Sequence, residues 1–107
     1  MRLENSIVRE HSRLKGDYRL LVLECEAVAG PAKPGQFVHL RIPGDQSFVL
    51  RRPFSIFKAD GTSVSVLYKR VGRGTAAMDP VASGDTVNLL GPLGNGFPTD
   101  FGDAFPV

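Results

Sequence analysis

The side chains best suited to chemistry in this chain lie in two short segments, residues 50–56 and residues 67–75. The first segment reads Leu-Arg-Arg-Pro-Phe-Ser-Ile, and the second reads Leu-Tyr-Lys-Arg-Val-Gly-Arg-Gly-Thr. Arginine offers a rigid fork of donors that matches a diphosphate, glycine lets backbone N–H groups approach phosphate oxygens, and an aromatic ring packs against a flat heterocycle. The two segments therefore indicate a site for an anionic, planar cofactor such as a dinucleotide.

Two adjacent arginines follow Leu50 in the first segment, and each allows a plain structural alternative. Arg52 precedes Pro53, which removes a donor from the sheet and so points to an edge or a break in strand pairing. Arg52 either binds the diphosphate or pairs with an acidic side chain at the surface. Arg51 faces the opposite side of the strand, because side chains alternate, and we expect it to be solvated.

The aromatic residues also fit an ordinary interior. Phe54 and Tyr68 are typical of a hydrophobic core, and Ser55 is a small polar residue that any strand tolerates. A hairpin through the Ala-Asp-Gly-Thr turn at 59–62 would bring these three side chains together at one end of a sheet. The Val-Gly-Arg-Gly-Thr run at 71–75 is either a loop that leads into a short helix or a nest of N–H groups for an anion.

The remaining reactive side chains do not form a catalytic or metal site in the sequence. Cys25 is the single cysteine, so it cannot form an internal disulfide or hold zinc or an iron–sulfur cluster by itself, and we expect a buried thiol. His11 and His39 are distant in sequence and lack supporting carboxylates, which favours structural roles. A redox cofactor that carries its own chemistry is therefore the better basis for a catalytic role.

Length and charge restrict the class of protein. A chain of 107 residues with 42% hydrophobic content supports one domain and one core. No apolar run approaches the ~20 residues that cross a bilayer, and the first ten residues do not resemble a signal peptide, so we expect a cytoplasmic protein. The net charge of +2 is mild, and two short basic clusters fit one bound phosphate group better than a nucleic-acid track.

Glycine and proline recur about every ten residues, between segments rich in β-branched, leucine and aromatic residues. This spacing predicts an all-β barrel or sandwich. A helix of about two turns is expected over Gly74 to Val81, limited by Pro80. The glycine-rich stretch 90–98 is expected to be a loop. The six predicted strands are Leu3 to Leu14, Tyr18 to Cys25, Phe37 to Ile42, Phe48 to Lys58, Ser63 to Tyr68 and Thr86 to Leu90.

Four motifs occur in one order along nearly the whole chain: Pro-Gly-Gln-Phe-Val-His-Leu at 34–40, the 50–56 segment, Leu-Tyr-Lys at 67–69 with Gly74-Thr75, and Leu-Gly-Pro-Leu-Gly-Asn-Gly-Phe at 90–97. In this order they resemble the ferredoxin–NADP reductase-like flavoproteins, and most of all the electron-transfer subunits of bacterial dihydroorotate dehydrogenases. The resemblance implies a six-stranded antiparallel Greek-key barrel that binds FAD, with one short helix after Gly74.

The resemblance also assigns roles to residues of the two segments. Arg52 would clasp the FAD diphosphate, Phe54 would lie by the flavin or ribityl chain, and Ser55 would bond near flavin N5. Residues 67–69 would line the isoalloxazine and ribityl, and residues 74–75 would give donors to the diphosphate. Phe54 stands where tyrosine is common in the superfamily, so only packing remains there. The implied cofactor-binding residues are Arg52, Pro53, Phe54, Ser55, Leu67, Tyr68, Lys69, Gly74 and Thr75.

The resemblance further implies a longer protein in the pyrimidine pathway. Residues 1–100 would form the FAD-binding barrel, and residues 101–107 would begin a nucleotide-binding domain, followed by a cysteine-rich segment with a [2Fe–2S] cluster. The complete protein would pass electrons from NADH through FAD and the cluster to a catalytic partner subunit. We therefore expect a fragment or truncated gene product that binds FAD, is not fully active alone, and binds neither NADH well nor a membrane.

Three alternatives stay open from the sequence. A small basic barrel with scattered phenylalanines can bind single-stranded nucleic acid. An interaction domain that has lost its cofactor can dock to a partner. A sibling reductase-type subunit can share the same barrel.

Overall fold

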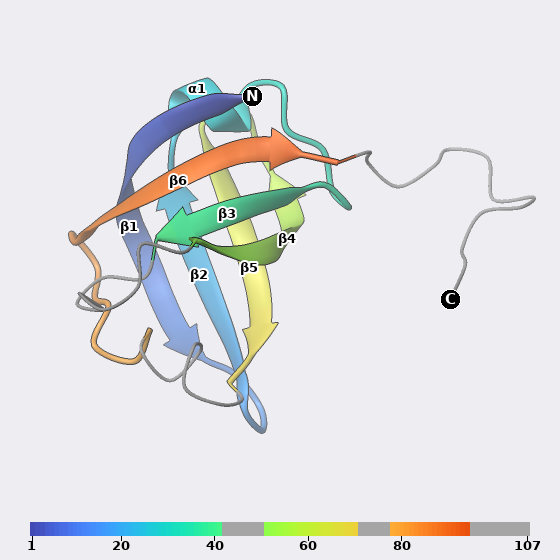
Figure 1. The fold of residues 1–107 in the computed structure, drawn as a ribbon. Helices are drawn as coiled ribbons and strands as arrows, with labels where there is room; N and C mark the ends of the chain where they lie inside the picture. Colours follow the sequence, from blue (N-terminus) through green and yellow to red (C-terminus); the bar gives the residue numbers. More distant parts are fainter. Residues whose placement is uncertain (42–50, 71–77, 95–107) are drawn as a thin grey trace, which may run out of the picture.

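A computed structural model describes residues 1–41, 51–70 and 78–94 of the chain. These residues form six strands and one short helix (Figure 1). The elements are β1 (Arg2–Arg13), β2 (Tyr18–Glu24), α1 (Glu26–Ala29), β3 (Phe37–Arg41), β4 (Arg51–Ala59), β5 (Ser63–Lys69) and β6 (Thr86–Leu93). All six predicted strands are present, and their ends within the described residues match the prediction or differ from it by at most three residues. The predicted strand end at Ile42 and the predicted strand start at Phe48 lie outside the described residues.

The strands close into one barrel in the order β1-β2-β5-β4-β3-β6, and every neighbouring pair is antiparallel. Strands β3, β4 and β5 follow one another as neighbours, and β6 returns to lie beside β3, which is the Greek-key arrangement. Closure gives every strand two neighbours, so the barrel has no edge strand. The expected six-stranded antiparallel Greek-key barrel is confirmed.

Side-chain alternation along the strands fills the barrel interior. On β5, the residues Val64 and Val66 are fully buried, and Tyr68 is nearly so, while the residues between them are half-buried. Ser6 is the buried polar residue of the described core, and its hydroxyl donates to the carbonyl oxygen of Val87 at 2.6 Å. The largest fully buried side chains are Leu21, Leu23, Leu40, Ile56, Met78, Leu89, Val8, Val28, Val38, Val64, Val66 and Val87.

The short helix closes one end of the barrel, beside the N-terminus (Figure 1). Its first turn is tied to β1, because the carboxylate of Glu4 accepts a hydrogen bond from the backbone N–H of Val28 at 3.0 Å. Cys25, expected at the end of a strand, is the residue before this helix, and its thiol is buried as predicted. The sequence did not predict α1, because four residues are too few to establish a helical pattern.

The helix expected over Gly74 to Val81 falls mostly outside the described residues. Its described part does not continue a helix, because Met78, Asp79 and Pro80 form a turn. The backbone N–H of Val81 donates to the carbonyl oxygen of Met78 at 2.9 Å, which closes this turn. Met78 itself is fully buried, so the turn anchors the chain to the core.

The expectation that the chain leaves the sheet at Leu90 was wrong, because β6 continues to Leu93. The cause is tertiary pairing on both sides of this strand, with Arg2 of β1 opposite Gly91 and Phe37 of β3 opposite Leu93. Glycine is suited to this position because the backbone of β3 passes close by. A Cβ atom at position 91 would lie 2.9 Å from Cγ1 of Val38.

We predict that Gly91→Ala lowers the free energy of unfolding by about 1 to 3 kcal/mol, the usual effect of overfilling a packed interior. The new methyl group would press on Val38, which is fully buried and cannot move aside easily. Urea unfolding of the two proteins measures the difference.

The matched control is Gly30→Ala, because a Cβ atom at position 30 meets only the carbonyl oxygen of Glu26, at 3.4 Å. Gly30 has helical backbone angles, so alanine fits there, and we expect a change within about 0.5 kcal/mol. Equal stabilities of Gly91→Ala and the wild type would contradict the close packing of β6 on β3.

Candidate cofactor site

The barrel end opposite α1 carries a concentration of positive charge. Strands β1, β3 and β5 finish at this end, and β2, β4 and β6 begin there, next to one another in the barrel. We call it the cationic end, because seven of the 13 lysines and arginines lie on its strand termini and the residue that follows β5. They are Arg13, Arg19, Arg41, Arg51, Arg52, Lys69 and Arg70.

The pairing of β4 with β5 stops before the two strands reach the cationic end. Its last pair is Ile56 with Val66, although each strand continues for several residues and remains paired to its other neighbour. The stretches 52–55 and 67–69 therefore lie on facing edges that strand pairing does not use. Unused N–H and C=O groups need water or a ligand as partners. This is the arrangement that a flat, polar heterocycle needs for backbone contacts.

Two aromatic side chains close the interior side of this unpaired stretch. The rings of Phe54 and Tyr68 meet edge to face with their centroids 5.4 Å apart. Both are buried, at 6% and 7% exposure. The predicted approach of Phe54 and Tyr68 through the turn at 59–62 is confirmed, and both rings take the core position that the sequence allowed as an alternative. Ser55 does not join them, because it lies on the opposite face of β4 from Phe54.

Tyr68 is held in place by a histidine from β1, two strands away in the barrel. Nδ1 of His11 lies 2.7 Å from the carbonyl oxygen of Val81, and Nε2 lies 2.6 Å from the Tyr68 hydroxyl. A carbonyl oxygen can only accept, so Nδ1 carries a proton and, in the neutral ring, the hydroxyl donates to Nε2. Burial raises the pKa of Tyr68 from 10.0 to about 12, so the hydroxyl keeps its proton, and its role as donor, well above neutral pH. The structural role expected for His11 agrees with these contacts.

The two adjacent arginines have different surroundings, as the alternation of side chains predicts. Arg52 is exposed at the start of β4, on the same face as buried Phe54. Arg51 is not solvated as expected, because its guanidinium donates to the carbonyl oxygen of Asn88 at 3.4 Å and to the Asn88 side-chain oxygen. The sequence could not predict this bond, since Asn88 is reached across β3. Among the described residues, no carboxylate forms an ion pair with Arg52.

The other predicted cofactor residues on these strands are accessible. Ser55 and Pro53 are exposed on β4, Lys69 is exposed on β5, and Leu67 is half-buried. Ser55 lies opposite Phe37 of β3, on the outer face of the barrel. The structure thus brings Arg52 to Ser55 and Leu67 to Lys69 to one barrel end. Gly74 and Thr75 lie outside the described residues.

The chain on either side of residues 71–77 is tied together. Nε of Arg70 lies 3.0 and 2.8 Å from the two carboxylate oxygens of Asp79. The backbone N–H of Arg70 also donates to the carbonyl oxygen of Asp17 at 2.8 Å. These bonds hold the described residues that flank 71–77 to each other and to the barrel, whereas the predicted anion-binding run 71–75 lies outside the described residues.

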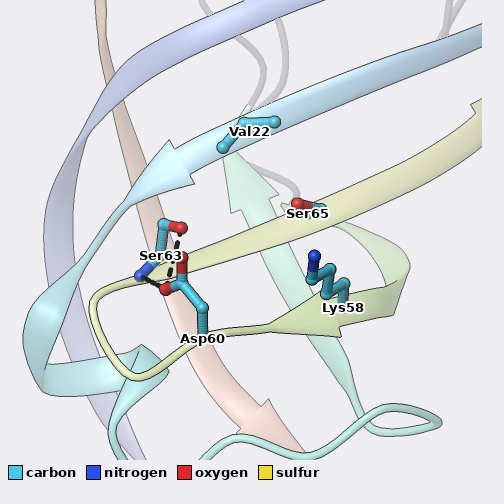
Figure 2. A pocket seen from close by; sticks show the side chains of 5 residues that line it. All are labelled: Val22, Lys58, Asp60, Ser63 and Ser65. Atoms are coloured by element: carbon cyan, nitrogen blue, oxygen red, sulfur yellow. Dashed lines mark hydrogen bonds between the residues drawn. The ribbon is translucent and has the colours of Figure 1, made fainter.

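A separate hollow of about 110 Å³ lies on the outer face, between β2, β4 and β5. Figure 2 shows the Asp60 carboxylate turned toward Ser63, with Lys58 and Ser65 nearby and Val22 on the adjacent strand. Oδ1 of Asp60 accepts from the backbone N–H of Ser63 at 2.7 Å and from that of Thr62 at 3.0 Å. The carboxylate therefore shapes the β4–β5 turn, and we assign this hollow no ligand.

FAD fits the cationic end better than this hollow, for reasons visible in the structure. The unpaired edges of β4 and β5 offer backbone groups, and exposed Arg52 offers a charge without an acidic partner among the described residues.

Within the described residues, no group of three or more His, Cys, Asp or Glu side chains is arranged to hold a metal ion. The described residues include no helix long and apolar enough to cross a membrane.

Solved structures with the same barrel define the class of protein. The cytochrome P450 reductase of Amycolatopsis matches 92% of the chain with a TM-score of 0.73 and 28% identity, and the match covers 30% of that chain. Phthalate dioxygenase reductase, whose structure is described as a modular one for electron transfer from pyridine nucleotides to [2Fe–2S], gives a TM-score of 0.73 at 21% identity, with 92% and 32% of the two chains covered. The fold is the FAD-binding barrel of ferredoxin-reductase-like proteins.

One kind of subunit recurs among the curated sequences to which the chain is similar. The chain is a homologue of the electron transfer subunit of dihydroorotate dehydrogenase B (NAD(+)). It is 34% identical to the Geobacillus sp. WCH70 protein over 102 residues and 38% identical to that of Shouchella clausii over 97 residues, which are 94% and 89% of the chain. It spans about 40% of the length of these relatives, 40% and 37% in the two cases. No family model matches the chain.

We predict that Tyr68→Phe lowers the free energy of unfolding by about 0.5 to 1.5 kcal/mol, the net value of one hydrogen bond. The change leaves Nε2 of His11 without its donor in a partly buried position. Chemical denaturation gives the difference, with Tyr18→Phe as the control. Tyr18 is 46% exposed, and its hydroxyl has no hydrogen bond among the described residues. Similar losses in both variants would refute a specific role of the His11 contact.

We also predict an acid-dependent contribution of Asp60. Backbone hydrogen bonds from Ser63 and Thr62 lower the pKa of this carboxyl from 3.8 to about 2. The folded state therefore prefers the ionised form, and the stabilisation is complete above about pH 4 and is lost as the pH falls toward 2. Thermal unfolding of wild type and Asp60→Asn should give a gap in Tm that narrows over this range. A gap that stays constant from pH 6 to pH 2 would contradict the assignment.

Proposed function

We propose that this chain binds FAD at the cationic end, as the flavin module of an electron-transfer oxidoreductase. The observation that carries the proposal is the early end of the β4–β5 pairing, beside an exposed arginine and two aromatic rings. Homology to the electron transfer subunits of dihydroorotate dehydrogenase B supports the same cofactor class.

Each part of the site would meet a different part of the cofactor. Arg52 would bind the diphosphate through its guanidinium fork. Ser55 would donate to or accept from the flavin edge, and residues 67–69 would offer backbone groups along the ring and ribityl chain. Gly74 and Thr75 would complete the diphosphate site. Bound FAD would supply the exchange of a hydride for single electrons, which no side chain of this site can perform.

The packed pair of Phe54 and Tyr68 would form the wall behind the flavin and exclude water from the interior. Tyr68 has little freedom to move, because His11 holds its hydroxyl and Phe54 contacts its ring. A rigid wall reduces the ordering that binding requires. The residues of this chain would thus bind and orient the cofactor.

The complete protein would extend this module. Residues 1–100 would form the FAD-binding domain, and residues 101–107 would lead into a domain for NAD(H), followed by a [2Fe–2S] cluster. Electrons would pass between NAD(H), FAD and the cluster to a catalytic dihydroorotate dehydrogenase subunit in the cytoplasm, within pyrimidine biosynthesis. The names of the relatives, of which the chain spans about 40%, support the NAD(H) and dihydroorotate dehydrogenase parts of this proposal.

The test is a titration of the purified chain with FAD, followed by flavin fluorescence. We expect saturable quenching, and we expect Arg52→Ala to weaken binding by about 1.5 to 3 kcal/mol, the range for a hydrogen bond to a charged group. Arg2→Ala is the control. Arg2 is exposed at the start of β1, so this substitution removes the same charge at the other barrel end.

The two variants separate a specific site from general attraction. Equal weakening by Arg52→Ala and Arg2→Ala would mean that only net charge matters. Unchanged fluorescence of FAD with the wild-type chain would reject the proposal itself.

A further inference from the structure

A second hollow, of about 280 Å³, lies at the cationic end on the β1–β2 side. Strand β1 contributes three of its lining residues, β2 contributes one, and the segment before β6 contributes two. The lining residues are His11, Ser12, Arg13, Arg19, Asp79 and Val81. This volume is at the small end for ligand sites, so it suits a compact group with a few waters.

The two arginines of this hollow lie on the interior face of the barrel. Arg19 alternates on β2 with Leu21 and Leu23, both of which are fully buried. Arg13 is the cross-strand partner of Arg19, and partners in a sheet share a face. Arg19 is also the partner of Tyr68 on β5. The apolar interior of the barrel thus ends, at the cationic end, in the paired residues Arg13 and Arg19.

The charge of this pair is not neutralised within the described residues. Asp79 is the acidic lining residue, and both of its oxygens accept from Arg70. No carboxylate of the described chain lies within 4.0 Å of the Arg13 or Arg19 guanidinium. Within the described residues, the Arg19 guanidinium donates only to the carbonyl oxygen of Tyr18, at 3.2 Å.

The other polar lining groups are already occupied. Both ring nitrogens of His11 have partners, namely Val81 and Tyr68. The hydroxyl of Ser12 donates to the Glu10 carboxylate at 2.5 Å. Glu10 is the partner of Val22, which alternates with buried Leu21, so this carboxylate faces the outer side of the sheet. The arginine pair is therefore the part of the hollow that is left to bind a ligand.

We propose that Arg13 and Arg19 bind a phosphate group in this hollow, as a site distinct from Arg52. Guanidinium forks match the oxygens of a phosphate, and two of them from adjacent strands can hold one dianion from two sides. The phosphate belongs either to a small phosphorylated ligand or to the dinucleotide cofactor itself. The chemistry at the arginine pair is the same in both cases.

The test is a titration of the chain with inorganic phosphate at constant ionic strength, with chloride as the balancing salt. The NMR signals of the arginine Nε–H groups report the site directly and require no flavin. We expect saturable shifts for Arg13 and Arg19. Arg13→Gln and Arg19→Gln should each weaken phosphate binding about tenfold or more, whereas Arg2→Gln should leave it unchanged.

Conservative variants guard against a trivial loss of structure. Arg13→Lys and Arg19→Lys keep the charge and lose the fork, so they should retain part of the affinity while the backbone spectrum stays native. Shifts that grow linearly at all arginines, or binding that is unaffected by either Gln variant, would overturn the proposal as general ion screening.

A second titration, in the presence of saturating FAD, identifies the source of the phosphate. If saturating FAD abolishes phosphate binding to the wild-type chain, the hollow binds the cofactor's own phosphate. The control is Arg52→Ala without FAD, which should still bind phosphate. Simultaneous binding of FAD and phosphate assigns it to a separate phosphorylated ligand. Because the first titration is done without flavin, it stays decisive even if the chain fails to bind FAD.

Discussion

The contact between Phe54 and Tyr68 holds the barrel together where its backbone pairing ends. Strands β4 and β5 share no pairs beyond Ile56 and Val66, so side chains must keep the two strand ends in place. The edge-to-face rings do this from the interior, and His11 extends the support across the barrel through the Tyr68 hydroxyl. The facing edges can therefore stay open to a ligand without exposing the core.

This arrangement explains why one end of the barrel carries the candidate sites and the other does not. At the end that holds α1, the chain itself covers the interior, and Glu4 bonds the backbone of the helix. At the cationic end, the interior face finishes in Arg13 and Arg19, while Arg52 lies exposed on β4. A purely apolar rim would need a covering element, whereas charged groups stay hydrated until an anion replaces water. The charge is thus concentrated at the end where we propose that the phosphate groups of FAD bind.

Much of the fold could be predicted from the sequence, because alternation and turn residues are local signals. The six strands, the hairpin at 59–62 and the burial of Cys25 follow from such patterns. The continuation of β6 through Gly91 could not be predicted, since its cause is pairing with β1 and β3. The bond between Arg51 and Asn88 likewise depends on which strands become neighbours.

The sequence predicted which residues lie at the candidate site better than it predicted the contacts between them. Arg52, Ser55 and residues 67–69 do lie at one barrel end, as their segments suggested. The sequence had no signal for the arginine pair on β1 and β2 or for the link from His11 to Tyr68, because each joins residues distant along the chain. Such pairs become visible only when the barrel order is known.

Hydrogen exchange of backbone amides, with and without saturating FAD, tests the central claim most directly. In the free chain, amides on the unpaired edges should exchange faster than amides that are paired within the barrel. The account predicts that FAD slows exchange most within residues 52–55 and 67–69, while the paired amides of β1 change little. Saturable FAD binding that leaves those two stretches unprotected would contradict it.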